Sequence, residues 1–321
     1  MGLRIHFTCE DVARTTFAAK PDPLWELLLS LHQLQTDDAP QVFGKWRRRV
    51  RSGLGEQERR LLELAPATGY SPDFLTPPES ADGLGAGLDA LARTDRGRLR
   101  TDLERLDDTP RWAGSLLAAD GPNRLARAMR GYFRSYIRPY WPTISQEVDH
   151  DLNARAKTFM TRGLGGLSSE LNQGMAWNSP VLEVDLGRAR SQDLHLDGRG
   201  LRLIPSYFCW RYPITLRDPN LQPVLVYPVR HRPFVEPVAE TKAATEQALG
   251  SLLGRTRAAV LRSISLGGCS TTELAQRVGI SPASASEHAR VLNQAGLIST
   301  RRVGAAVNHT IGPTGRVLLG A

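Results

Sequence analysis

Apolar residues recur every three or four positions over much of the first half of the chain, which is the spacing of one buried helix face. Pro23 opens a strongly apolar helix with the sequence LWELLLSLHQL, and another helix is expected from Val42 to Leu54. From Leu88 to about Leu171 the pattern is again mainly helical. The front of the chain is therefore predicted to form a packed helical bundle.

A β-type pattern occurs at both ends of this helical region. Leu3–Phe7 alternates like a short strand, and Thr8 with Asp11 resembles a capping box that opens a short helix. After Trp177, the segments VLEVDL, LHLDGRGLRLIPS and PVLVYPV are β-like, the middle one around an Asp197–Gly198 turn. A small sheet is therefore expected to follow the helices.

Proline and glycine mark the breaks between these regions. The Pro/Gly-rich segment from Pro66 to Gly87 is expected to be a long surface loop, and three prolines, the last being Pro237, mark a joint before helix resumes near Glu240. We place the domain boundary there. The predicted fold class is α+β, with a mainly helical front domain carrying a small sheet (1–240) and a C-terminal winged helix-turn-helix (241–321).

The C-terminal domain shows helices separated by turn residues. A first helix is expected from Leu249 to about Leu266, where Gly267–Gly268 stops it. A two-turn helix then runs from Thr271 to Val278, capped by Ser270 or by its own first residue. Gly279 supplies the tight turn that follows, because this reversal commonly needs a positive φ.

The next helix has the features of a DNA-reading helix. Ser281 is a natural N-cap, and Pro282 stands at the first helical position, where a missing donor is harmless. Ala285, Ala289 and Leu292 lie four and three residues apart and form a buried stripe. Short side chains on the other face allow the helix to enter the major groove deeply.

A basic hairpin is expected to follow this helix. The segments LISTRR and AVNHTI pair around residues 303–305, so that arginines lie near the tip, where a wing touches phosphates or the minor groove. Serines of the reading helix can bond to phosphates or base edges, and the helix arginines suit phosphate contacts. The predicted DNA-binding residues are Thr271, Thr272, Arg277, Ser281, Ala283, Ser284, Ser286, Glu287, Arg290, Arg301 and Arg302.

The ordered set SPASASEHARVLNQAGLI and RRVG resembles the winged-helix domain of ArsR/SmtB-type regulators over roughly the last 70 residues. The front part, with RIHFTCEDVARTTFAAKPDPLWELLLSLH and LDGRGLRLIPSYF, is similar to an uncharacterised N-terminal region joined to such domains in actinobacterial regulators. This resemblance implies a transcriptional regulator, commonly a homodimeric repressor that binds an operator in double-stranded DNA. Some members of the family release DNA when a metal binds.

The metal-sensing part of the resemblance is not supported by the residues. The familiar thiolate pair on the DNA-reading helix is absent, because Gly268–Cys269–Ser270 holds one cysteine and Ser284–His288 holds none. His288 is interpreted as a packed or phosphate-contacting residue, and inert burial is favoured for Cys269 over oxidation sensing. We therefore expect no metal and no cofactor, and the signal is expected to be non-metal.

Charge supports an acidic partner at the C-terminal domain. The whole chain has a formal net charge of +8, and the residues from Thr245 onward carry eight Arg and three Glu with no Lys or Asp. The excess positive charge thus sits mostly beside the predicted DNA reader, as phosphate neutralisation requires. The cluster Arg47, Arg48, Arg49 and Arg51 is instead interpreted as a solvated helix face, which we favour over a phosphate site.

Apolar runs and cysteine usage indicate the cellular compartment in which the protein is expected. No run approaches the roughly 18 apolar residues of a membrane span, and the chain opens with charged residues instead of an apolar signal segment. Its three cysteines are far apart and suit a reducing compartment. We expect a cytoplasmic protein with no membrane partner.

Two further groups of residues in the front domain have side chains that could form a site. Aromatic residues could line a small-molecule effector pocket, with ordinary core packing as the alternative; they are Trp177, Tyr207, Phe208, Trp210 and Tyr212. Glu147, Asp149, His150 and Asp151 crowd one helix, where adjacent positions point in different directions and cannot all converge. No nucleophile, phosphate-loop or dinucleotide motif is present, so the chain is not expected to be an enzyme.

Two other functions remain open from the sequence. One is a winged-helix module for protein interaction that has lost DNA binding, against which the basic wing argues. The other is an enzyme in the front domain that the winged helix regulates. The front domain is expected to set dimer geometry or to receive an effector.

Overall fold

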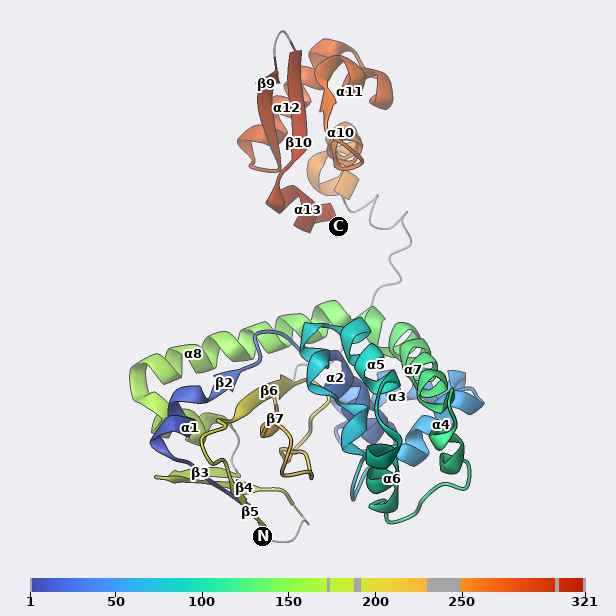
Figure 1. The fold of residues 1–321 in the computed structure, drawn as a ribbon. Coiled ribbons are helices and arrows are strands. Elements are labelled where there is room, and N and C mark those ends of the chain that lie inside the picture. The colour runs from blue at the N-terminus through green and yellow to red at the C-terminus, as the bar shows by residue number, and fades with distance from the viewer. Residues whose placement is uncertain (1, 172–173, 188–191, 230–248, 304–305, 320–321) are drawn as a thin grey trace. The chain divides into compact units, whose positions relative to one another are not determined.

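The computed structural model describes residues 2–171, 174–187, 192–229, 249–303 and 306–319 (Figure 1). The chain forms two compact units, Met1–Pro237 and Val238–Ala321. The α+β class predicted from the sequence is confirmed, with helices and small sheets in the front unit and a helix-turn-helix in the C-terminal unit. Within these ranges, no helix combines the length and apolar character needed to cross a bilayer.

The front unit is mainly helical. Its α-helices are α1 (Cys9–Arg14), α2 (Pro23–Leu34), α3 (Pro40–Gly53), α4 (Glu56–Leu64), α5 (Leu84–Ala92), α6 (Arg96–Glu104), α7 (Gly121–Tyr132) and α8 (Trp141–Leu171). Shorter 3-10 or π turns are η1 (Asp73–Leu75), η2 (Pro78–Asp82), η3 (Ala113–Leu117), η4 (Phe133–Ile137) and η5 (Arg138–Tyr140). Gly163 has non-helical angles and kinks α8.

Two sheets, not one, complete the front unit. Sheet A has the order β3 (Met175–Asn178), β4 (Val181–Asp185), β1 (Gly2–His6) and β5 (Gln192–His195), with only the β1–β5 pair parallel. Sheet B is all parallel, with the order β2 (Thr16–Phe17), β6 (Arg202–Ser206) and β7 (Val224–Pro228). The segment LHLDGRGLRLIPS therefore contributes one strand to each sheet, and its ends do not pair across the Asp197–Gly198 turn.

Sheet B lies between two cores, which explains its composition. Successive strand residues face opposite sides, so Leu203 and Leu225 pack with sheet A residues, while Ile204 and Val226 pack with the helices. A parallel sheet covered on both faces needs nearly continuous apolar strands, as in VLVY of β7. The front unit is thus layered as sheet A, sheet B and helices.

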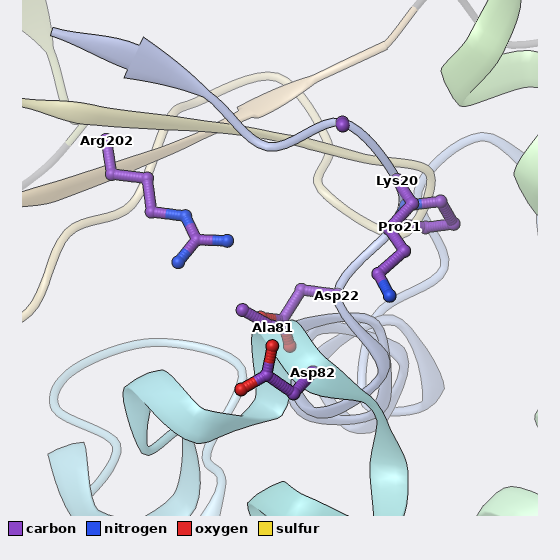
Figure 2. Close-up of a pocket in the computed structure, with 7 residues that line it drawn as sticks. Lys20, Pro21, Asp22, Ala81, Asp82 and Arg202 are labelled. Carbon is purple, nitrogen blue, oxygen red and sulfur yellow. The ribbon is translucent and has the colours of Figure 1, made fainter.

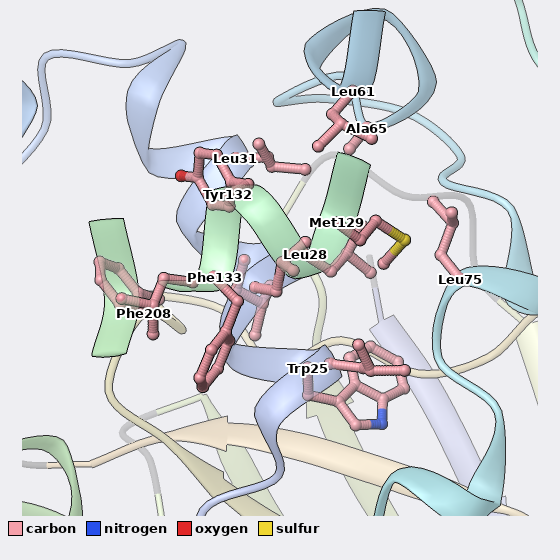
Figure 3. Packing of buried hydrophobic residues seen from close by; sticks show 14 of the residues in the cluster. Trp25, Leu28, Leu31, Leu61, Ala65, Leu75, Met129, Tyr132, Phe133 and Phe208 are labelled. Carbon is pink, nitrogen blue, oxygen red and sulfur yellow. The ribbon is translucent and has the colours of Figure 1, made fainter. Parts of the chain in front are cut away.

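The helical core is built around α2, because eleven of its twelve residues are buried. Asp22 caps this helix by accepting hydrogen bonds from the backbone N–H groups of Leu24 and Trp25. Figure 3 shows Trp25 and Leu28 packed among residues from other helices, including Met129 of α7 and Leu61 of α4. The helical bundle predicted for the front of the chain is therefore present.

The segment 66–87 is not the long surface loop that its proline and glycine content predicts. It forms η1 and η2 and the start of α5, and Phe74 and Leu75 are buried in the helical core. The Asp73 carboxylate accepts hydrogen bonds from the backbone N–H groups of Arg217 and Asp218. These long-range contacts fix a segment whose local sequence indicates only turns.

The arginine cluster of α3 is not a simple solvated face either. Arg47 is buried and donates hydrogen bonds to the backbone oxygens of Gln33 and Asp38, and Arg51 donates to the backbone oxygen of Leu34. Both thereby bond to carbonyl groups at and beyond the end of α2. Arg48 and Arg49 are exposed, as expected.

The C-terminal unit contains α10 (Arg255–Ser265), β8 (Cys269–Ser270), α11 (Thr271–Val278), α12 (Pro282–Gln294), β9 (Ile298–Val303), β10 (Ala306–Ile311) and α13 (Pro313–Leu319). Residues 249–253 are also helical, but Gly254 has a φ of 85° and interrupts the single helix expected there. The strands form an antiparallel sheet of order β8-β10-β9. The order of helices and hairpin is that of the predicted winged helix.

Candidate nucleic-acid interface

Local capping signals set the angle between α11 and α12. The Ser270 hydroxyl accepts a hydrogen bond from the Glu273 N–H and caps α11, and the Ser281 hydroxyl accepts one from the Ser284 N–H and caps α12. Between them, Gly279 ends α11 with a φ of 71°, a left-handed conformation that favours glycine. Short polar residues and one glycine thus mark where the two helices begin and where the first one ends.

One face of α12 is buried and the other is free of the domain core. Ala285, Ala289 and Leu292 are the buried residues, as their spacing predicts. They pack with Leu274 and Ala275 of α11 in the core of the C-terminal unit. The opposite face exposes Ala283, Ser284, Ser286, Glu287 and Arg290. A helix with short side chains at its exposed N-terminal end has the form that fits a major groove.

The charged residues of this surface are paired within their own helices. Arg290 donates hydrogen bonds to both carboxylate oxygens of Glu287, at 2.6 and 3.0 Å, and this contact lowers the pKa of Glu287. Arg277 pairs in the same way with Glu273 on α11, at a spacing of i,i+4 where Arg290 and Glu287 are spaced i,i+3. These pairs are solvent-exposed and weak, so either arginine can exchange its carboxylate for a phosphate at small cost.

The hairpin of β9 and β10 supplies the wing. Arg301 lies opposite Asn308 in the register, and its side chain is exposed. Arg302 lies opposite Val307; its side chain, and residues 304–305 at the tip, lie outside the described part of the structure. Of the two predicted wing contacts, the structure therefore places the side chain of Arg301.

A buried histidine joins the wing to α11, which sequence reasoning missed. His309 of β10 is 4% exposed, and its Nε2 and Nδ1 each lie 3.0 Å from a hydroxyl, of Thr271 and of Thr300 respectively. Burial lowers the pKa of His309 because the charged imidazolium loses hydration. Thr271, predicted to contact DNA, is thus already bonded inside the domain, whereas Thr272 is exposed. The available signal was strand alternation, which places His309 on the same face as Ile311, two residues further along.

The five aromatic residues predicted as an effector pocket do not line one cavity. Tyr207 and Phe208 are fully buried in the helical core, where Phe208 lies 4.7 Å from Trp46 between ring centroids. Trp177 packs against Phe7 in the separate core between the sheets. Trp210 is partly buried beside the helical core, and Tyr212 is 47% exposed. Core packing, the alternative interpretation of these aromatic residues, therefore describes Tyr207 and Phe208.

A cavity of about 350 Å³ lies instead at the N-terminal end of α2, lined by Ala19, Lys20, Pro21, Asp22, Ala81, Asp82 and Arg202 (Figure 2). Its walls come from the β2–α2 connection, the end of η2 and the first residue of β6. No local motif predicts this site, because the three segments that form it are far apart along the chain.

The acidic residues of α8 separate as the helical geometry predicts. Glu147 and Asp151 are buried, whereas Asp149 and His150 are exposed. Asp151 forms a bidentate ion pair with Arg155, whose guanidinium lies 4.6 Å from the ring centroid of Tyr227. These residues hold α8 against sheet B.

Comparison with known proteins gives one family match. Residues 252–301 match the family model described as a helix-turn-helix domain. Among solved structures, reduced HlyU from Vibrio cholerae N16961 is similar over 25% of this chain and 86% of that chain, at 22% identity and a TM-score of 0.21, which is too low to carry an argument. A search of curated proteins gave no significant match. The match and the geometry of α11, α12 and the wing support a DNA-binding transcriptional regulator, and the chain carries a C-terminal helix-turn-helix domain.

Proposed function

We propose that the protein is a homodimeric repressor that reads a near-palindromic operator with its winged helix and works in the cytoplasm. The observation that carries the proposal is the exposed face of α12, which combines short residues near its N-terminus with Arg290 further along. Such a helix places its N-terminal residues against base edges in a major groove. The exposed Arg301 on the hairpin supplies a phosphate contact beside it.

Dimerisation and repression rest on the resemblance to ArsR/SmtB-type regulators. A symmetric dimer would place two copies of α12 one helical turn of DNA apart, about 34–36 Å, which predicts an operator with two related half-sites. In this proposal the front unit contributes a response to a non-metal signal. A DNA reader of this size does not itself require a layered unit of helices and two sheets.

Gel shifts with DNA from upstream of the protein's own gene test the proposal. We expect a complex with that fragment that resists a tenfold excess of unrelated duplex, and an affinity that falls steeply as salt rises. Absence of any specific complex even at low salt would contradict it. Sedimentation of the complex would show two protein chains per operator if the dimer is correct, and one chain if it is not.

A further inference from the structure

The cavity at the start of α2 brings together four ionisable side chains of both signs. Lys20 and Arg202 carry positive charge, and Asp22 and Asp82 carry negative charge. Figure 2 shows the Arg202 guanidinium and the Lys20 ammonium extending from different walls toward the side where Asp22 and Asp82 lie. The charges thus come from three segments that only the fold brings together.

The oppositely charged side chains of the cavity are not hydrogen-bonded to one another. Within the described residues, the side chains of Lys20, Asp82 and Arg202 make no hydrogen bond and no ion pair, although Arg202 is half-buried. Asp22 is 4% exposed, and its carboxylate accepts hydrogen bonds from two backbone N–H groups of α2 and from the Ser80 hydroxyl. Arg202 attracts the Asp22 carboxylate electrostatically but leaves its five guanidinium donors available to an anionic group of a ligand.

The carboxylates decide which class of anion fits. A phosphate or another purely anionic group bound to Arg202 would also lie in the same small cavity as the carboxylates of Asp22 and Asp82. Like charges that share one cavity repel. A molecule that carries a cation as well would offset this repulsion by donating to the carboxylates. The volume of about 350 Å³ lies at the small end of ligand cavities, which limits the ligand to a small molecule.

We propose that this cavity is a binding site for a small zwitterion, such as an amino acid, with its carboxylate on Arg202 and Lys20 and its ammonium on Asp82 and Asp22. Binding at this site does not depend on the function proposed above; only the assignment of the ligand as an effector of DNA binding rests on it. Asp22 is also the N-cap of the most buried helix and bonds to Ser80 of η2. A ligand here would therefore contact the residue that joins two elements of the helical core.

Isothermal titration calorimetry of the full chain, without DNA, tests the site. The probes are glycine, β-alanine and 4-aminobutyrate, which separate the two charges by increasing lengths, with acetate, methylammonium and inorganic phosphate as single-sign controls. We expect at least one zwitterion to bind with one-to-one stoichiometry, at least tenfold more tightly than any control. No binding of the three zwitterions up to about 10 mM would overturn the proposal, as would acetate or phosphate binding as tightly as the best zwitterion.

Substitutions of the cavity residues test whether the zwitterion binds there. Arg202→Gln and Asp82→Asn should each weaken the best zwitterion by about 10- to 100-fold, since each removes a charge-assisted hydrogen bond. Arg134→Gln, on an exposed position of η4, is the matched control and should bind as the wild type does. Lys20 and Asp82 are exposed, so Lys20→Gln and Asp82→Asn test the site even if Arg202→Gln does not fold. Wild-type affinity in both Arg202→Gln and Asp82→Asn would contradict the site.

A separate measurement of DNA affinity tests whether the ligand is an effector. If the best zwitterion changes the DNA affinity of the wild type but not of Asp82→Asn, the ligand is an effector acting through this cavity. A wild-type protein that binds the zwitterion but no DNA would contradict the function proposed above while supporting the site. An equal change of DNA affinity in both proteins would overturn the effector assignment.

Discussion

The two units of the chain differ in what they bury. Among the described residues, fourteen buried polar or charged side chains belong to the front unit and one, His309, to the C-terminal unit. In the front unit these groups join distant segments, as where Glu26 of α2 accepts hydrogen bonds from Ser206, Tyr207 and Phe208. In the C-terminal unit, apolar spacing and local caps place the helices. Local sequence signals therefore specify one unit, and long-range polar contacts complete the other.

The largest loss of stability in the front unit is expected when one partner of a buried ion pair is removed. The side chains of Asp151 and Arg155 are 3% and 6% exposed. Asp151→Ala leaves the Arg155 charge buried without its bidentate carboxylate and should cost about 3–5 kcal/mol of unfolding free energy. All six tryptophans lie in the front unit, so denaturation followed by tryptophan fluorescence reports that unit alone.

The matched control is Asp149→Ala on the same helix, because Asp149 is exposed. It should change stability by no more than about 0.5 kcal/mol. Equal effects of the two substitutions would show that the ion pair does not hold α8 in place.

Glu26 should give the front unit an unusual pH dependence. Burial raises the pKa of Glu26 from 4.5 to about 7 and outweighs its three hydrogen-bond donors. Between these values the folded unit keeps a proton on Glu26 that the unfolded chain has released, so the Glu26 contribution to stability falls as pH rises, by up to about 1.4 kcal/mol per pH unit. Fluorescence-detected unfolding at pH 5, 6 and 7 measures the slope. Desolvation lowers the pKa of His32 to about 4, so this ring contributes a slope of opposite sign in both proteins. The Glu26 effect is therefore the stability of the wild type minus that of Glu26→Gln, which should fall from pH 5 to pH 7; parallel pH curves for the two proteins would refute this.

His309 should give the C-terminal unit a smaller pH effect of the opposite sign. Because burial lowers its pKa below 6.5, the folded domain holds this ring neutral while the unfolded chain takes up a proton. Stability is therefore fully present above about pH 6.5 and is lost as pH falls toward the folded pKa. Hydrogen exchange of α11 and α12 at pH 7.5 and 5.5 measures it, with His309→Asn as the neutral comparison. The quantity compared is the protection factor, because base-catalysed amide exchange is itself faster at the higher pH. A larger protection factor at pH 5.5 than at pH 7.5 in the wild type would reverse the assignment.

The smallest effect concerns a cap. Ser281→Ala removes the hydroxyl that bonds to the Ser284 N–H and should destabilise the C-terminal unit by about 1 kcal/mol. Ser286→Ala, on the exposed face of the same helix, should be nearly neutral for stability. Chemical denaturation monitored by the amide signals of α12 distinguishes them. A neutral Ser281→Ala would show that the helix start is fixed by Pro282 and packing alone.

The two units also differ in how far the sequence predicts them. The capping residues Ser281 and Gly279, and the stripe of Ala285, Ala289 and Leu292, act within a few residues, so periodicity and turn chemistry identify them. The hydrogen bond of Thr271 inside the domain could not be predicted from local sequence, because its partner His309 lies 38 residues away. In the front unit, the two-sheet arrangement follows from pairing β1 with β4 and β5, and that register depends on contacts between residues 175 to 189 positions apart. The burial of Arg47 depends on a nearer segment, since its acceptors are backbone carbonyls 14 and 9 residues earlier in the chain.

The central claim is that the exposed face of α12 reads DNA. The most direct test is the affinity of a Ser284→Ala/Arg290→Ala double variant for a fragment that genome-wide mapping shows the wild type to bind. Neither residue is buried, so the variant should keep its thermal stability while binding about 10- to 100-fold more weakly near 0.15 M salt. Wild-type affinity in a correctly folded double variant would contradict the claim.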